Sequence, residues 1–178
     1  MARKRETPIC MRYLAGAAGG AAGTFAMDSY MRAMKKALPD GKHSKPKEHL
    51  ISLIGRKHEK GESSTAALGR MLYEAATGER PSERTRKTLS KAVHWGYGVD
   101  LGGLYGVVRG RKRKLDVLGG LIYGVGLWVL GDEIAVPLIG LAEGPKAYPT
   151  KIHAESLGAH LVYGVATAVA TQLLRKIV

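Results

Sequence analysis

The sequence predicts an all-α, polytopic integral membrane protein with about four transmembrane helices and a surface-lying helical insert. Four stretches are mostly apolar and close to the roughly 20 residues that a spanning helix needs. Most of the 24 glycines lie inside these stretches, where small residues let membrane helices approach closely. Each stretch also carries acidic or histidine side chains, which are costly in lipid and are therefore candidates for function. The stretches are residues 11–34, 92–110, 115–141 and 153–174.

The chain divides into three parts by composition. Residues 1–34 form a basic N-terminus and the first transmembrane helix, residues 35–91 a polar, basic insert, and residues 92–178 three further transmembrane helices. A basic start before an apolar run also fits a signal peptide. Because the run continues to residue 34, a retained first helix is favoured.

The insert predicts two amphipathic helices. Residues 47–57 place Leu50, Ile51, Leu53 and Ile54 on one helical side, and residues 64–77 repeat the pattern before Gly78, a typical C-terminal stop. Such helices lie on a membrane surface or pack on the helix bundle. A further helix, begun by Pro81, should run through the polar residues 82–91 into the second membrane stretch without a break.

Glycines spaced by four residues predict close helix contacts in the first three membrane stretches. The contact glycines are Gly16, Gly20, Gly98, Gly102, Gly106, Gly120 and Gly124. Tyr-Gly-Val also recurs, beginning at Tyr97, Tyr105, Tyr123 and Tyr163. The recurrence fits either an old helix-hairpin duplication or the reuse of these residues wherever helices cross closely, and the second is favoured.

Two features of the sequence predict how the later helices run. The short connector 109–114 makes the second and third stretches an antiparallel hairpin. Gly131 and Pro137 bracket Asp132 and Glu133, so the third helix should kink or break there. Residues 144–149 read as a turn-rich loop leading to the last helix.

The net charge of +13 lies mainly in flanks and loops. Basic residues there fit anionic lipid headgroups better than nucleic acid, which we do not expect as a partner. The headgroup contacts expected in the connector are Arg109, Arg111, Lys112, Arg113 and Lys114. The N-terminus, the connector and the C-terminus carry 4, 5 and 2 Lys/Arg residues against two in the last loop. This bias predicts cytoplasmic termini, although the basic insert on the opposite side conflicts with it unless the insert is translocated regardless.

If all four stretches span the membrane, ionisable residues from each of them lie toward the same membrane face. The expected proton or ion track comprises Asp28, His94, Asp100, Asp132, Glu133, His153 and His160. Asp100 lies about 9 Å deeper than His94 at 1.5 Å per residue, and a mid-segment acid should face the bundle interior or water. Histidine titrates near neutral pH, which suits proton handling.

Other interpretations of these residues stay open. Asp28 and Glu155 can be solvated at the membrane interface, and His94 can be an interfacial anchor beside Trp95. Asp132 and Glu133 can cap a broken helix or pair with a basic residue of the insert. The set could also ligate a divalent metal, and His94 with His160 could ligate haem.

No cofactor or metal is expected from the sequence, since it lacks zinc-site spacings, and its single cysteine, Cys10, excludes an internal disulfide. Nucleophile-elbow, Walker and His-Glu-x-x-His motifs are also absent, which favours a non-enzymatic protein.

The chain resembles the YagU-like family of small bacterial inner-membrane proteins, a domain of unknown function. The similarity lies in residues 15–28, in His94-Trp-Gly-Tyr-Gly98, in Gly131-Asp-Glu before Pro137, and in Ala159-His-Leu-Val-Tyr-Gly164. It covers nearly the whole chain apart from the insert, which is more basic than that family leads one to expect. The resemblance implies a multi-pass inner-membrane location and a link to acid resistance, with no known reaction or catalytic residues.

The sequence therefore favours proton or ion handling through the Asp/Glu/His cluster. The alternative is a non-catalytic membrane scaffold or assembly subunit that binds anionic lipid or a partner protein. Four glycine-rich helices enclose little space, so a homo-oligomer or a larger membrane complex is expected.

Overall fold

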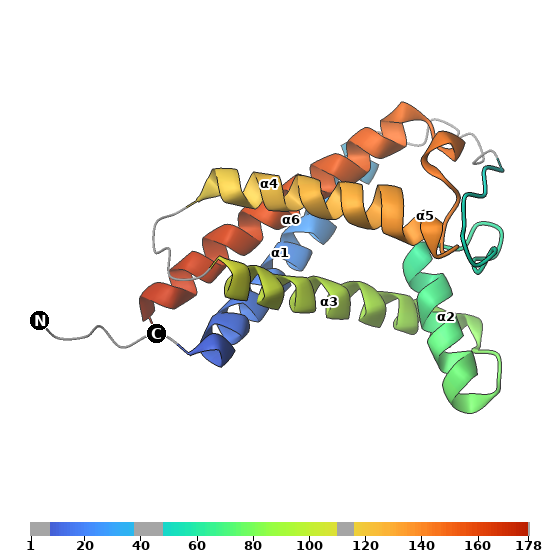
Figure 1. Cartoon of the computed structure of the whole chain (residues 1–178), viewed down its shortest axis with the longest axis horizontal. Coiled ribbons are helices and arrows are strands. Elements are labelled where there is room, and N and C mark those ends of the chain that lie inside the picture. The colour runs from blue at the N-terminus through green and yellow to red at the C-terminus, as the bar shows by residue number, and fades with distance from the viewer. Residues whose placement is uncertain (1–7, 38–47, 110–115, 178) are drawn as a thin grey trace, which may run out of the picture.

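The computed structural model describes residues 8–37, 48–109 and 116–177, and within these ranges all regular secondary structure is helical. The all-α prediction is confirmed for this part of the chain. The long helical segments are α1 (Ile9–Ala37), α3 (Glu83–Val108), the segment Val117–Leu138 that begins with α4 (Val117–Leu127), and α6 (Thr150–Ile177) (Figure 1). The shorter elements are α2 (Ser64–Thr77), the π-helix η1 (Trp128–Ala135), α5 (Val136–Leu138) and the 3₁₀-helix η2 (Pro145–Ala147).

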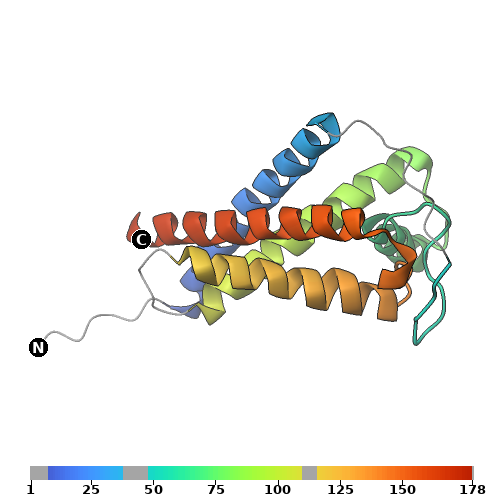
Figure 2. The same cartoon turned by 90° about the horizontal axis from the view of Figure 1, so that it is seen from above.

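The long helices run alternately up and down. Helix α1 packs against both α3 and α6, while α4 packs against α6 and α2 against α3. Figures 1 and 2 show that α1 starts and α6 ends at one end of the molecule, where α3 also ends and α4 begins. Helix α2 and the loop before η2 occupy the opposite end, which we call the insert end.

The contact between α1 and α3 is made of glycine on both sides. A Cβ atom placed on Gly102 would lie 2.6 Å from both the carbonyl oxygen of Gly16 and the amide nitrogen of Gly20. One placed on Gly106 would lie 2.7 Å from the Cα of Gly16. No side chain fits between the two backbones, so the four-residue glycine spacing is what lets these helices touch.

Two further crossings use the same device. Gly19 and Gly23 turn a second glycine face of α1 toward Thr171 and Thr167 of α6. On the other side of α6, Gly120 and Gly124 of α4 meet the backbone around Gly164 and His160. All seven glycines that the sequence placed at helix contacts lie at such crossings, as does the glycine of each Tyr-Gly-Val repeat.

The helix starts follow local capping chemistry. Ser63 caps α2 by accepting a hydrogen bond from the amide of Ala66, and Gly78 ends that helix with φ at 72°, a left-handed conformation that favours glycine. The helix bounds predicted here, 64–77, are confirmed. Ser82 caps α3, which then continues unbroken into the second apolar stretch as predicted.

The helix predicted over residues 47–57 is wrong for the described part, 48–57, which has no helix. Its backbone bonds to the segment after α5 instead: Leu53 N–H donates to the carbonyl oxygen of Leu138 at 2.9 Å, and Lys57 N–H to that of Gly140 at 2.8 Å. The apolar residues that predicted a helix do not share one buried face: Ile51 is half-buried, whereas Leu53 is 80% and Ile54 58% exposed. These hydrogen bonds to a distant segment determine the conformation of residues 48–57, and the local helical pattern does not.

The predicted break around Asp132 and Glu133 takes the form of a π-helix. Residues Trp128–Ala135 form one widened stretch between α4 and α5. Pro137 has no amide hydrogen and so cannot bond to the carbonyl of Glu133 in the α-helical pattern. The chain therefore widens without a sharp kink, a change often found at functional sites.

Two helical segments of the described chain are long and apolar enough to cross a membrane, Val117–Leu138 and Thr150–Lys176. Only 11% of the most apolar window of the first is buried, against 39% for the second. The first segment therefore presents an apolar surface to its surroundings instead of forming a protein core.

Candidate functional site

A cavity of about 750 Å³ lies between α1, α3, η1 and α6, toward the insert end. Most of its lining is apolar, and the apolar side chains include Met27, Met31, Met34, Val93, Leu101, Leu127, Val136 and Ile152. The polar lining residues are Thr24, Tyr30, Lys35, Ser64, Thr65, His94, Tyr97, Asp132, Glu155, Ser156, His160 and Tyr163. A large apolar cavity with few convergent polar groups is the usual form of a small-molecule site.

Asp28 and His94 form the first acid–histidine pair. They extend from α1 and α3, and His94 Nε2 lies 3.1 Å from Asp28 Oδ1. Both side chains are partly buried, at 26% and 30% exposed. This pairing disfavours the interpretation of His94 as an interfacial anchor alone, because the ring is held by a carboxylate from a different helix.

Asp132 and His160 form a second pair, between η1 and α6. His160 Nε2 lies 3.8 Å from Asp132 Oδ2, and the hydroxyl of Ser156 donates to the same oxygen at 2.7 Å. The other ring nitrogen, Nδ1, donates to the carbonyl oxygen of Ser156 at 2.9 Å. The Asp132 side chain is 44% exposed, so it is accessible from the cavity.

Glu133 and His153 form the third pair. His153 Nδ1 lies 2.6 Å from Glu133 Oε1, and Nε2 lies 3.0 Å from the carbonyl oxygen of Pro145. They line a second cavity of about 200 Å³, whose walls include Asp132 and Ser156. Asp132 therefore borders both cavities and connects the second pair to the third.

The hydrogen-bond contacts of His153 determine the minimum number of protons on the Glu133–His153 pair. A carbonyl oxygen only accepts hydrogen bonds, so Nε2 must carry a proton. The 2.6 Å contact at Nδ1 then needs one more proton, located either on the ring or on the Glu133 carboxyl group. His160 has the same layout, with one nitrogen on a main-chain carbonyl and the other facing a carboxylate.

The widened helix explains how neighbouring carboxylates can both reach α6. Asp132 and Glu133 are consecutive, and consecutive side chains of an α-helix point about 100° apart. Within η1 they approach Ser156 and His153 respectively, which are three residues apart on one face of α6. The π-helix thus turns two acids toward a single partner helix.

Asp100 does not join these residues. Its side chain is exposed, and its Oδ1 accepts a 2.5 Å hydrogen bond from the hydroxyl of Tyr13 on α1. Of the two surroundings expected for a mid-segment acid, the bundle interior and water, Asp100 does not take the first, because the glycine face of α3 makes the contact with α1. Asp100 is absent from the lining of both cavities.

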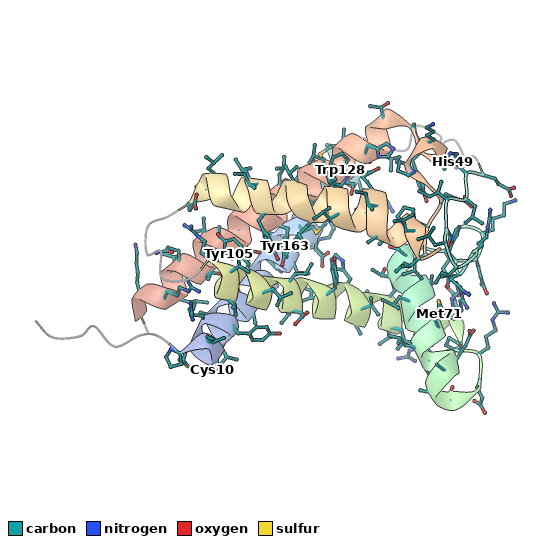
Figure 3. The ribbon with its side chains drawn as sticks, viewed as in Figure 1. Cys10, His49, Met71, Tyr105, Trp128 and Tyr163 are labelled. Carbon is teal, nitrogen blue, oxygen red and sulfur yellow. The ribbon has the colours of Figure 1, made fainter. Side chains whose placement is uncertain are left out.

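Three neighbouring tyrosines lie beside the large cavity, and one of them, Tyr163, lines it. The hydroxyl of Tyr123 donates to the carbonyl oxygen of Leu101 at 2.7 Å, and that of Tyr163 to the carbonyl oxygen of Gly98 at 2.6 Å. The ring centroids of Tyr105 and Tyr123 are 4.9 Å apart, and the ring centroids of Tyr123 and Tyr163 are 6.3 Å apart. Figure 3 shows Tyr105 and Tyr163 in the space between α3 and α4. We call Tyr105, Tyr123 and Tyr163 the tyrosine layer.

Glu143 is a structural centre that the sequence did not single out. Its side chain is 8% exposed and lies 2.9 Å from an Arg56 nitrogen and 3.3 Å from His58 Nε2. It also accepts a 2.9 Å hydrogen bond from the amide of His49. One carboxylate thereby fastens the loop before α2 to the loop before α6, and no periodic pattern marks such a residue.

Most arginines of the insert form ion pairs with carboxylates of the same chain. Arg70 is 9% exposed and lies 3.1 Å from both Glu62 and Glu74, while Arg86 lies 3.1 Å from Glu62. The hydrogen bond from Arg70 to Glu62 raises the pKa of the Arg70 guanidinium, outweighing its partial burial. These contacts attach α2 to α3 and reduce the positive charge available for a partner.

At the opposite end, Arg109 lies 2.6 Å from Asp116, which also caps α4 through the amide of Gly119. The other expected headgroup contacts, Arg111, Lys112, Arg113 and Lys114, lie outside the described residues.

Within residues 8–37, 48–109 and 116–177, no three His, Cys, Asp or Glu side chains are placed to hold a metal ion together. The two histidines considered for haem, His94 and His160, are each engaged with a carboxylate of their own.

Comparison of the chain with protein-family models, with curated proteins and with solved structures found no match.

Proposed function

We propose that this chain is a four-span integral membrane protein that handles protons through the acid–histidine pairs of its central cavity. One observation carries the proposal: two such pairs, Asp132–His160 and Glu133–His153, line two cavities that share Asp132, and His94 of the third pair lines the larger one. Intramembrane acids and histidines are the groups from which proton relays are built. The resemblance to a family linked with acid resistance agrees with this role.

Exposed apolar side chains support the membrane location. Large apolar residues are exposed on every long helix, including Leu14 at 60%, Leu104 at 48%, Ile122 at 65% and Leu173 at 55%. A surface of this kind is covered by lipid or by protein. With α1 and α3 spanning alongside the two more apolar segments, the basic connector 109–114 and both termini lie on the cytoplasmic side, in the inner membrane of a bacterium.

The cavities suggest a route for protons from the insert end. Glu133 and His153 share a proton in the small cavity, and Asp132 lies next to Glu133 on the same helix and borders both cavities. A proton can then pass to the Asp132–His160 pair in the large cavity. Transfer from there to the other face would pass the tyrosine layer, whose Tyr163 lines the large cavity.

Proton flux into liposomes tests the proposal. The purified protein is reconstituted with a trapped pH dye, and an imposed gradient drives flux. We expect flux above empty vesicles that Asp132→Asn abolishes. Asp100→Asn is the matched control, since it removes an equivalent carboxylate outside both cavities, and it should retain wild-type flux.

Absence of flux in folded, inserted protein would contradict the proposal, as would loss of flux in Asp100→Asn with retention in Asp132→Asn. Absence of flux would support the second candidate, a membrane scaffold, whereas dependence on Asp100 alone would place the proton route outside the cavities. That candidate is favoured by one observation, the exposed apolar pair Leu53 and Ile54 on a loop that Glu143 holds in place. Binding of this loop to a partner protein, or assembly into an oligomer, would cover the pair.

A further inference from the structure

The large cavity has properties that a proton alone does not require. Its volume of about 750 Å³ suits a small organic molecule, and carboxylates and histidines could relay protons without such a space. The methionines Met27, Met31 and Met34 form much of one wall. Methionine is flexible and polarizable, and it is over-represented at surfaces that accept varied apolar ligands.

The charged groups on the lining favour a cation. Two carboxylates, Asp132 and Glu155, face the cavity against one ammonium group, that of Lys35. Glu155 has Lys151 at 3.7 Å, whereas the partners of Asp132 within the described residues are the hydroxyl of Ser156 and the ring of His160. No arginine or lysine of the described chain pairs with Asp132, so its negative charge is available to a ligand.

Aromatic rings add to this preference. Tyr30, Tyr97 and Tyr163 come from α1, α3 and α6, and all three line the cavity. The face of an aromatic ring attracts a cation, and the attraction grows when the site excludes water. Rings from three helices and a carboxylate from η1 surround the same space.

The cavity is also accessible from outside the bundle. Three lining residues, Met31, Tyr97 and Ile139, are 51%, 55% and 46% exposed. Tyr163 of the tyrosine layer also lines it. A ligand can therefore enter between apolar side chains at the bundle surface and reach Asp132 without crossing the whole protein.

From this combination we infer that the cavity binds a lipophilic organic cation, with the apolar body against the methionine wall and the positive charge beside Asp132. The inference rests on the proposed function in that both use Asp132, and it names the class of solute whose movement the protons would accompany. Binding itself requires no proton flux, so the two proposals can fail separately.

Equilibrium dialysis with tetraphenylphosphonium tests the inference on the purified full chain in nanodiscs. We expect saturable binding that Asp132→Asn weakens about tenfold, because the charge pair between this carboxylate and the bound cation is lost. Ala135→Trp, at an exposed lining position on η1, should also weaken binding by filling the space. Asp100→Asn should bind as the wild type does.

Tetraphenylborate, an anion of nearly the same shape, provides a control on the unaltered protein. Wild-type protein that binds the anion as tightly as the cation would overturn the inference even if the variants fail to fold. Absence of saturable cation binding would overturn it as well. In that case proton flux that depends on Asp132 would leave the proposed function standing, whereas cation binding without such flux would remove the proposed function and keep the site.

Discussion

Replacing Gly102 by alanine should separate α1 from α3. The added Cβ would lie 2.6 Å from backbone atoms of Gly16 and Gly20, and ordinary van der Waals contact begins at 3.4 Å. Because the Cα of Gly20 would be closer still, the helices must move apart by at least about 0.8 Å, and a radial gap of that size forfeits a quarter to a half of the attraction between packed atoms. We expect a loss of about 1–3 kcal/mol in the free energy of unfolding, the usual cost of overpacking.

Gly96→Ala is the matched control on the same helix. Nothing lies within 4 Å of a Cβ at that position, so the substitution should leave stability unchanged or raise it by up to about 1 kcal/mol through helix propensity. Reversible unfolding of both variants in one detergent, followed by circular dichroism, gives the comparison. If Gly102→Ala proves as stable as Gly96→Ala, the glycine contact does not hold α1 against α3.

Three further outcomes follow from the contacts. Glu143→Gln should free residues 48–58, since it weakens the bonds to Arg56 and His58, and limited proteolysis should then cut this loop faster while the long helices stay intact. Arg70→Met should detach α2, seen as faster hydrogen exchange in Ser64–Thr77. Because the pKa of Arg70 is raised above its ordinary value, the stabilisation it supplies is present below the unfolded-state pKa and is lost only as the pH rises through the higher folded-state pKa. Exchange in wild-type α2, corrected for intrinsic rate, should therefore stay constant between about pH 7 and pH 10. Tyr123→Phe should cost about 1 kcal/mol in thermal unfolding, the net worth of its bond to Leu101.

Periodicity and spacing sufficed for much of the fold. The glycine spacing located the helix crossings, and the capping residues bounded α2 within the insert. The glycine spacing repeats every four residues, and the caps directly flank α2. Both signals are local in the sequence, so they can be recognised without knowledge of the fold. The helix prediction for residues 48–57 was wrong because their backbone hydrogen bonds go to a segment about 80 residues later, which no local pattern encodes.

The candidate site was predictable in part for a related reason. Depth along a helix brought Asp28 to the level of His94 and Asp132 to that of His160. Depth does not give the rotation of a helix, and rotation decides which face meets the cavity. The glycine face of α3 packs on α1, which leaves Asp100 outside beside Tyr13. Glu143 was missed because its role depends on two loops meeting.

The protonation state of Asp132 tests the central claim most directly. Infrared difference spectra of the reconstituted protein between acidic and alkaline pH report the carboxyl groups that gain or lose a proton. We predict a protonated-carboxyl band that disappears in Asp132→Asn and remains in Asp100→Asn. A spectrum that Asp132→Asn leaves unchanged would show that this carboxylate exchanges no proton, and would contradict the proposed role of the cavity.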